Sequence, residues 1–293
     1  MIFIIFISVI GIVLFFIFAE SRRECKQFKV TSYFIPVESK DMDNLKIVMM
    51  ADLHSGYFSR NSENLLKTVT GLAPDMIIIA GDMITCRRKE KKNNITTAGF
   101  INKLCDIAPV FYGMGNHERG VKNLPEKMGD NWEEYTRLLN HEVKMLSNRY
   151  VTINRENSRI SIYGLDISGK YFKRLYKKKL FKEDVDKLLG EPDEGYNILI
   201  AHNPDYFYQY EEWGANLVLS GHNHGGMIQL GRLGGLITPR LRIFPKYYHG
   251  LYKRNGTDMI LTNGLGAHSI KIRVNNIPEI VFIKFGINGT DKG

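Results

Sequence analysis

The chain begins with a long apolar segment. No charged residue occurs between Met1 and Ala19, and a single serine and a single glycine interrupt the run of aliphatic and phenylalanine side chains. About 18 consecutive apolar residues suffice for a membrane-spanning helix. A cleaved signal peptide is disfavoured, because no basic residue precedes the segment and Phe18-Ala19-Glu20 is a poor cleavage site. We therefore expect residues 1–19 to be a retained, single-pass transmembrane anchor in the cell membrane.

A basic cluster follows this segment. Arg22, Arg23 and Lys26 come directly after it, and no basic residue comes before it. Positive charge beside a membrane helix favours the cytoplasmic side, although one short cluster leaves the side of the membrane open. We expect a polar connector over residues 20–44 and a catalytic domain on the cytoplasmic side.

Three continuous apolar runs in the first half of the chain each stop at polar residues. Leu45–Met50 leads to Asp52 and His54, Met76–Ala80 leads to Gly81-Asp82, and Pro109–Met114 leads to Gly115-Asn116-His117. Short continuous apolar runs are typical of buried strands. Helical patterns at 62–72 and 96–107 separate them, and this alternation predicts parallel strands joined by crossovers. Polar residues at the carboxyl ends of such strands form ligand sites.

The second half repeats the arrangement less regularly. Asn197–Ala201 leads to His202, and Asn216–Ser220 leads to His222 and His224. More strands are predicted at 159–163, 259–262 and 279–284, and Gly169–Gly190 has the pattern of a basic amphipathic helix that could touch a membrane. We expect one α/β domain over residues 45–285 and a C-terminal tail over 286–293.

The strand ends carry the residue types of a metal site. The predicted metal ligands are Asp52, His54, Asp82, Asn116, His202, His222 and His224. Residues two apart point to one side in an extended chain, so each Asp-x-His or His-x-His pair can present two ligands to one centre. The three cysteines form no Cys-x-x-Cys pair, so a thiolate site is not indicated. Carboxylate, imidazole and amide ligands suit two divalent ions such as Mn, Fe, Zn or Co.

Such a centre indicates a reaction at phosphorus. Asp82 can bridge two ions, which would lower the pKa of a shared water and provide a bridging hydroxide as the nucleophile. His117 is not needed as a ligand and is the predicted catalytic proton donor to the leaving group. Glycines such as Gly115 and Gly221 allow the backbone to pass close to metal or phosphate.

Taken singly, Asp-x-His or Gly-Asp occurs often by chance, whereas Gly-His-Asn-His-Gly-Gly is specific. The order D-x-H, G-D, G-N-H-E, H and G-H-x-H resembles the calcineurin-like metallophosphoesterase superfamily, and most of all its bacterial membrane-anchored branch of the YkuE and YaeI type. The resemblance covers about Leu45 to Lys284. Ala51, Thr85 and Met227 depart from the family pattern, but none of these departures removes a ligand.

The resemblance implies a four-layer α/β/β/α sandwich behind the transmembrane helix. It also implies how the ligands are shared. One metal would take Asp52, His54, Asp82 and His224, and the other would take Asp82, Asn116, His202 and His222, with His117 near the leaving group.

Net charge narrows the range of partners. The formal charge of +9 gathers in clusters at 87–92, 170–182 and 240–246. On an anchored domain these suit phospholipid or an anionic substrate, and no nucleic-acid motif accompanies them, so no nucleic-acid partner is expected. We expect a hydrolase of phosphoester or pyrophosphate bonds in a phosphorylated small-molecule or lipid-linked substrate. Alternatives are a UDP-sugar-lipid pyrophosphatase, a non-catalytic protein that binds anionic polymer or lipid, and a membrane-recruited nuclease.

Overall fold

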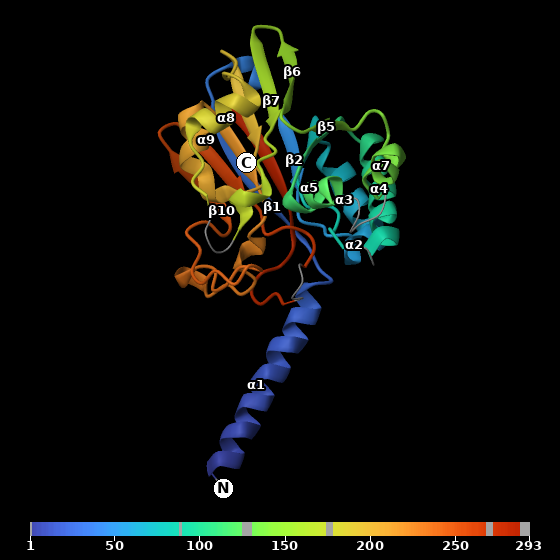
Figure 1. Ribbon diagram of the computed structural model, residues 1–293, viewed down its shortest axis with the longest axis vertical. Coiled ribbons are helices and arrows are strands. Elements are labelled where there is room, and N and C mark those ends of the chain that lie inside the picture. The colour runs from blue at the N-terminus through green and yellow to red at the C-terminus, as the bar shows by residue number, and fades with distance from the viewer. Residues whose placement is uncertain (1, 88–89, 125–130, 174–177, 268–271, 288–293) are drawn as a thin grey trace.

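Apolar strands of the chain assemble into two sheets that face each other. The computed structural model describes residues 2–87, 90–124, 131–173, 178–267 and 272–287. Within these residues the strands form two six-stranded sheets, sheet A and sheet B. Helices cover the outer face of each sheet, so that the two sheets lie in the middle of the body (Figure 1). The expectation of two mixed sheets flanked by helices is therefore confirmed.

Sheet A contains the strands of the first half of the chain together with the last strand. Its order is β1-β12-β2-β3-β4-β5. All neighbouring strands in it are parallel except β12 and β2. The strands are β1 (Lys29–Val37), β2 (Lys46–Met50), β3 (Met76–Ala80), β4 (Val110–Gly113), β5 (Lys144–Leu146) and β12 (Glu279–Ile287).

Sheet B contains the strands of the second half. Its order is β10-β11-β9-β8-β7-β6, with antiparallel hairpins at the two edges and parallel pairs between them. The strands are β6 (Arg149–Arg155), β7 (Ser158–Gly164), β8 (Tyr196–Ile200), β9 (Leu217–Ser220), β10 (Gly250–Arg254) and β11 (Thr257–Leu261).

Three apolar clusters hold the layers together. One lies between the sheets and joins side chains such as Ile47 and Ile78 of sheet A to Ile198 and Leu219 of sheet B. The second packs sheet A against its helices, and the third packs sheet B against its own. The helices on sheet A are α2 (Tyr57–Arg60), α3 (Glu63–Leu72), α4 (Lys91–Cys105), α5 (Asn116–Asn123) and α7 (Asn131–Leu138), and those on sheet B are α8 (Lys182–Leu189) and α9 (Phe207–Trp213).

Short 3₁₀ turns occur in the connecting segments at Lys40–Met42, Gly169–Phe172, Pro204–Tyr206, His224–Gly226 and Gly231–Leu233. The amphipathic helix expected over residues 169–190 is wrong in extent. A 3₁₀ turn occupies its start, and α8 begins only at Lys182. Leu180 is buried while the neighbouring Phe181 is exposed, because the segment before α8 is extended. Parts of two predicted basic clusters lie outside the described residues: 174–177 in the cluster at 170–182, and 88–89 in the cluster at 87–92.

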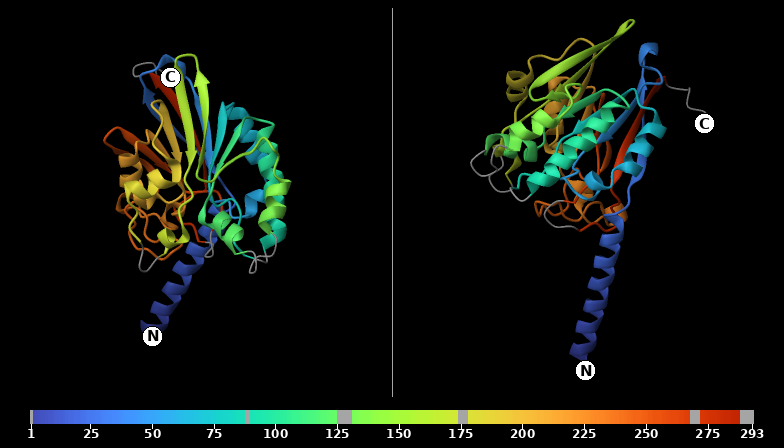
Figure 2. Two further views of the ribbon diagram at one scale, coloured as in Figure 1. Left: turned by 45° about the horizontal axis from the view of Figure 1, so that its top comes forward. Right: turned by 90° about the vertical axis from the view of Figure 1, so that its right-hand side faces the viewer.

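Helix α1 (Ile2–Glu24) projects away from the two-sheet body of the protein (Figures 1 and 2). Most of the apolar side chains that the structure describes on α1 are exposed, and the helix is long and apolar enough to cross a membrane. The last turn of α1 and the whole of β1 fall within residues 20–44, where we predicted a polar connector. Strand β1 pairs with β12 near the end of the chain. Most of the predicted tail, 288–293, lies outside the described residues.

Candidate metal centre

The predicted ligands lie together where both sheets present the carboxyl ends of their parallel strands. Sheet A contributes residues that follow β2, β3 and β4 in the chain, and those after β4 lie at the start of α5. Sheet B contributes residues after β8 and β9. The two sheets thus meet at one site. The residues are Asp52, His54, Asp82, Asn116 and His117 from sheet A and His202, His222 and His224 from sheet B.

Three overlapping groups of side chains have ligand atoms within 4.8 Å of one another. The first group is Asp52, His54 and His224, and the last is Asp82, His202 and His222. A middle group of His54, Asp82 and His117 connects them. Asp82 therefore lies close to ligand atoms on both sides of the site.

Donor atoms converge on common points inside these groups. His54 Nε2 lies 2.9 Å from His224 Nε2, and the latter lies 3.4 Å from Asp52 Oδ1. His202 Nε2 lies 3.1 Å from Asp82 Oδ2. Nitrogens and carboxylate oxygens that face one another at such distances suit coordination of a shared cation.

Two buried oxygens at the site support this reading. Asp52 Oδ1 and Asn116 Oδ1 have no hydrogen-bond partner in the described part of the chain. Burying a polar atom without a partner costs free energy, and buried native polar groups are nearly always satisfied. Together with imidazole nitrogens, these oxygens form the mixed donor set that first-row divalent ions accept. The residues present fit a divalent metal centre.

The backbone at the ligands is left-handed rather than extended. The φ angles are 55° at Asp52, 51° at His54, 54° at Asp82, 76° at His222 and 48° at His224. The extended backbone expected at the i, i+2 pairs is therefore wrong. Asp52 and His54 nevertheless share one group of ligand atoms, whereas His222 and His224 do not. His224 joins Asp52 and His54, while His222 joins the group of Asp82. Non-glycine residues in this region are strained, and such strain gathers at functional sites.

Two glycines make room for the aspartates. A Cβ atom at Gly115 would lie 2.2 Å from Asp82 Oδ1, and one at Gly221 would lie 2.5 Å from Asp52 Oδ2. A side chain at either position would push a carboxylate out of place. The sequence predicted that the backbone at these glycines passes close to metal or phosphate. In the structure, the carboxylates themselves occupy the space beside the glycines.

Hydrogen bonds orient two of the imidazole rings. His202 Nδ1 lies 2.7 Å from the carbonyl oxygen of Ala80 and donates to it, which leaves Nε2 as a lone-pair donor facing Asp82. His117 Nδ1 accepts a hydrogen bond of 2.8 Å from the backbone N–H of Cys86. The neutral His117 ring therefore carries its proton on Nε2.

Glu118 supports the sheet A half of the site, although sequence analysis assigned it no separate role. Its fully buried carboxylate accepts from the backbone N–H of Asp82 at 2.8 Å and of Gly115 at 3.0 Å. It also accepts from Met83 N, Ile84 N and the hydroxyl of Tyr112. One side chain thus ties the turn after β3 to the turn after β4. The only signal in the sequence was its place in Gly-Asn-His-Glu.

A second network supports His224 from the late loops. Asn276 Nδ2 donates to the carbonyl oxygen of His224 at 2.7 Å. The fully buried Arg273 donates to carbonyl oxygens of Asn263, Gly264 and Gly266. The end of α1 joins this network.

Two side chains in the last turn of α1 hydrogen-bond to the same late segment. Ser21 Oγ accepts from Arg273 N at 3.0 Å, and Glu24 Oε2 accepts from Asn276 N at 2.9 Å. The base of α1 is therefore part of the packing around the site. Sequence reasoning missed this, because the partners lie 252 residues apart in the chain.

Charges at the site are strongly coupled. Burial, with the nearby charge of Asp82, raises the pKa of Asp52 to about 7. Burial would also raise the pKa of Asp82, but the positive charges that His202 and His117 can carry hold it well below its usual range. Burial would lower the pKa of His202, yet Asp82 and Asp52 raise it to about 9. A divalent cation between the carboxylates would remove their repulsion and keep both ionised.

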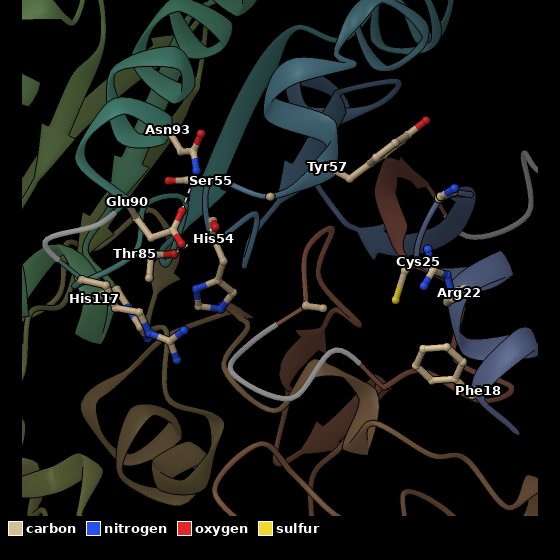
Figure 3. Close-up of a pocket in the computed structure, with 14 residues that line it drawn as sticks. Phe18, Arg22, Cys25, His54, Ser55, Tyr57, Thr85, Glu90, Asn93 and His117 are labelled. Carbon is tan, nitrogen blue, oxygen red and sulfur yellow. Dashed lines mark hydrogen bonds between the residues drawn. The ribbon is translucent and has the colours of Figure 1, made fainter. Parts of the chain in front are cut away.

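A large cavity of about 610 Å³ opens beside the metal ligands. His54, Thr85 and His117 line one side of it, and Phe18 and Arg22 of α1 line the other (Figure 3). The cavity thus runs from the metal centre to the end of the apolar helix.

A smaller cavity of about 190 Å³ lies beside His222. Phe172, Arg240 and Arg242 are among its lining residues. Sequence analysis had placed the two arginines only in a basic cluster.

The chain belongs to the calcineurin-like phosphoesterase family, which matches residues 45–226, more than half of its length. It is therefore a metallophosphoesterase, a phosphoester hydrolase of a family that uses divalent metal ions. The membership confirms the resemblance read from the ordered motifs.

Bacterial relatives are similar over most of their length. A metallophosphoesterase of Campylobacter jejuni, Cj0846, is 29% identical over 94% of this chain and 68% of the relative. The metallophosphoesterase YkuE of Bacillus subtilis is 28% identical over 88% of this chain and 83% of the relative. UDP-2,3-diacylglucosamine pyrophosphatase LpxG of Chlamydia muridarum is 26% identical over 85% of this chain and 86% of the relative.

Proposed function

We propose that the protein hydrolyses phosphoester or pyrophosphate bonds with two divalent metal ions. One ion would be held by Asp52, His54, Asp82 and His224, and the other by Asp82, Asn116, His202 and His222. The observation that carries the proposal is the place of Asp82, which shares ligand groups with His54 on one side and with His202 and His222 on the other. The donor set suits Mn, Fe, Zn or Co.

The residues around the ions have distinct tasks. Metal ions bound there would activate a water molecule for attack and neutralise charge on the phosphoryl oxygens. His117 would act from its protonated, imidazolium form, which gives one proton to the leaving-group oxygen and returns to the neutral ring. The contact of its Nδ1 with Cys86 N orients the neutral ring. Glu118 holds the backbone of Asp82, and Gly115 leaves space for its carboxylate, so little reorganisation is needed during the reaction.

We further propose that α1 spans the membrane and that the substrate is phosphorylated and linked to the membrane or cell envelope. The large cavity supports this, because its far wall consists of Phe18, Arg22, Cys25 and Lys26 at the end of α1. An amphipathic substrate can place its phosphate at the metal centre and its apolar part beside the helix. Arg22 and Lys26 are suited to anionic headgroups.

A UDP-sugar-lipid pyrophosphatase is a second candidate within this class. The similarity to LpxG of Chlamydia muridarum, named as UDP-2,3-diacylglucosamine pyrophosphatase, favours it. Such a substrate has a lipid and a diphosphate in one molecule, which suits a cavity that connects an apolar helix with a metal centre.

Metal analysis and hydrolysis tests on the full-length protein in detergent address these proposals. We expect about two metal ions per chain and hydrolysis of bis-p-nitrophenyl phosphate that chelation removes and metal addition restores. A single tightly bound ion in the active protein would contradict the two-metal proposal.

The substrate class needs a separate comparison. Hydrolysis of UDP-2,3-diacylglucosamine and of UDP-N-acetylglucosamine, which lacks the acyl chains, is measured in the same detergent. We expect preference for the acylated compound, and equal rates would contradict a lipid-linked substrate.

A further inference from the structure

The small cavity beside His222 contains a guanidinium group that the protein itself does not use. The cavity measures about 190 Å³ and lies next to a proposed metal ligand. Among the described residues, Arg240 has neither a hydrogen bond nor an ion pair with a carboxylate, and its contact is with the ring of Phe172, 5.6 Å from the ring centroid. Such a guanidinium retains its hydrogen-bond donors for a ligand.

Other polar side chains of the cavity are already engaged. Arg242 forms an ion pair with Asp205. Asn203 Nδ2 donates to the carbonyl oxygen of Tyr171 at 3.2 Å, and Asn223 Nδ2 donates to that of Tyr247 at 2.7 Å. Thr238 Oγ1 accepts from Arg242 N. Among the described residues of this cavity, Arg240 is thus the partly buried cation whose hydrogen-bond donors can still bind a ligand. Lys173 also lines the cavity, but its side chain is exposed.

Arg240 faces the metal centre. The Phe172 ring that lies against it also contacts the ring of His222, with centroids 5.2 Å apart at 70°. The pKa of His222 is lowered mainly by burial and, to a smaller extent, by the positive charge of Arg240. Burial lowers the pKa of Arg240, and the negative charges of Asp82 and Asp205 act to raise it. The guanidinium therefore lies within electrostatic reach of the proposed bridging carboxylate.

We propose that the small cavity is an oxyanion subsite in which Arg240 binds a phosphoryl oxygen of the substrate. This inference rests on the proposed phosphoester hydrolysis and adds a residue that contacts the reacting group. The planar guanidinium can donate two parallel hydrogen bonds to phosphate, and a partly enclosed site strengthens such charge-assisted bonds. The Phe172 ring contacts the guanidinium from one side. The large cavity on the side of His54 and His117 then receives the remainder of the substrate.

The subsite predicts a defect in anion binding that is separate from metal binding. Inorganic phosphate is the probe, and its dissociation constant is measured by calorimetry on the full-length, metal-loaded protein in detergent. In Arg240→Gln we expect phosphate binding to weaken by about 10- to 100-fold, the range for losing a hydrogen bond to a charged group. The metal content should equal that of the wild type. Hydrolysis of bis-p-nitrophenyl phosphate should fall in parallel.

Two further variants make the test specific. Arg240→Lys keeps the charge but loses the planar pair of donors, so its phosphate affinity should lie between the wild type and Arg240→Gln. Arg137→Gln, at an exposed position on α7, is the matched control and should bind phosphate as the wild type does.

The outcomes separate the subsite from the proposed function. Wild-type phosphate affinity and turnover in a folded Arg240→Gln protein would overturn the subsite and leave the hydrolase proposal intact. If the metal-loaded wild type hydrolyses no phosphoester, the proposed function fails, and the phosphate affinities of the three variants still decide the role of Arg240. If Arg240→Gln does not fold, an Arg240→Lys protein with unchanged phosphate affinity and turnover would overturn bidentate binding.

Discussion

The sheet A half and the sheet B half of the metal centre differ in chemistry and in how they are held. Sheet A supplies both carboxylates, and a buried glutamate, Glu118, ties two of its turns together. Sheet B supplies the three imidazoles His202, His222 and His224, positioned by contacts with distant carbonyl oxygens and amides. One half thus brings both carboxylates on a rigid base, and the other brings imidazole nitrogens. A cation between them would be bound by donors from both halves, and its binding at this edge would join the two sheets.

The largest effect is expected where the two halves share one residue. Asp82→Asn replaces the proposed bridge by a neutral amide, so we expect loss of both metals and of hydrolysis. Elemental analysis with turnover of bis-p-nitrophenyl phosphate measures this. Asp106→Asn, exposed at the end of α4, is the control and should keep both. Retention of two ions by Asp82→Asn would show that this carboxylate is not the bridge.

His117 tests whether the sheet A half also supplies the acid. His117→Ala should keep the metal content and reduce kcat by about 10²- to 10⁴-fold, because protonation of the leaving group is lost. The defect should be smaller for esters with acidic leaving groups such as p-nitrophenol. His141→Ala, at an exposed position, should behave as the wild type. Equal turnover of His117→Ala and the wild type on an alkyl phosphoester would exclude the acid role.

Glu118 tests the rigid base of the sheet A half. Glu118→Gln leaves one of its two oxygens and places an amide NH₂ against backbone donors, so a buried group loses its partner at a cost of about 1–3 kcal/mol. Urea unfolding of the metal-free protein in detergent should show that loss. The exposed Glu142→Gln is the control. An unchanged free energy of unfolding in Glu118→Gln would mean that the turns after β3 and β4 hold their shape without this carboxylate.

The smallest effect concerns the network that links α1 to the sheet B half. Deletion of residues 1–19 keeps Ser21 and Glu24, and it should give an active protein that needs no detergent. Deletion of 1–27 removes the acceptors of Arg273 N and Asn276 N, so it should lower the free energy of unfolding by about 1–3 kcal/mol relative to the shorter deletion. Equal stability of the two truncated proteins would show that the base of α1 only anchors the domain.

Metal ligands and the strands that precede them could be predicted from the sequence by itself. The strand predicted at Met76–Ala80 has those bounds in the structure, and β2 and β4 lie within one residue of their predicted bounds at each end. A buried strand is a continuous apolar run, and its end is marked by a sudden change to polar residues. The identity of the ligands followed from the order of those polar residues, and the family match supports that order.

Tertiary structure alone decided the backbone conformation at the ligands and what surrounds them. Spacing along an extended strand would keep His222 and His224 together, whereas the left-handed turns place them in separate groups. The pairing of β1 with β12, the position of Arg240 beside His222 and the contact of α1 with Asn276 all join segments that are distant in the chain. Local periodicity reports only which face of an element is apolar, whereas these contacts depend on how the two sheets pack. The sequence by itself therefore determined the chemistry of the ligands, and the packing of the sheets decided their geometry.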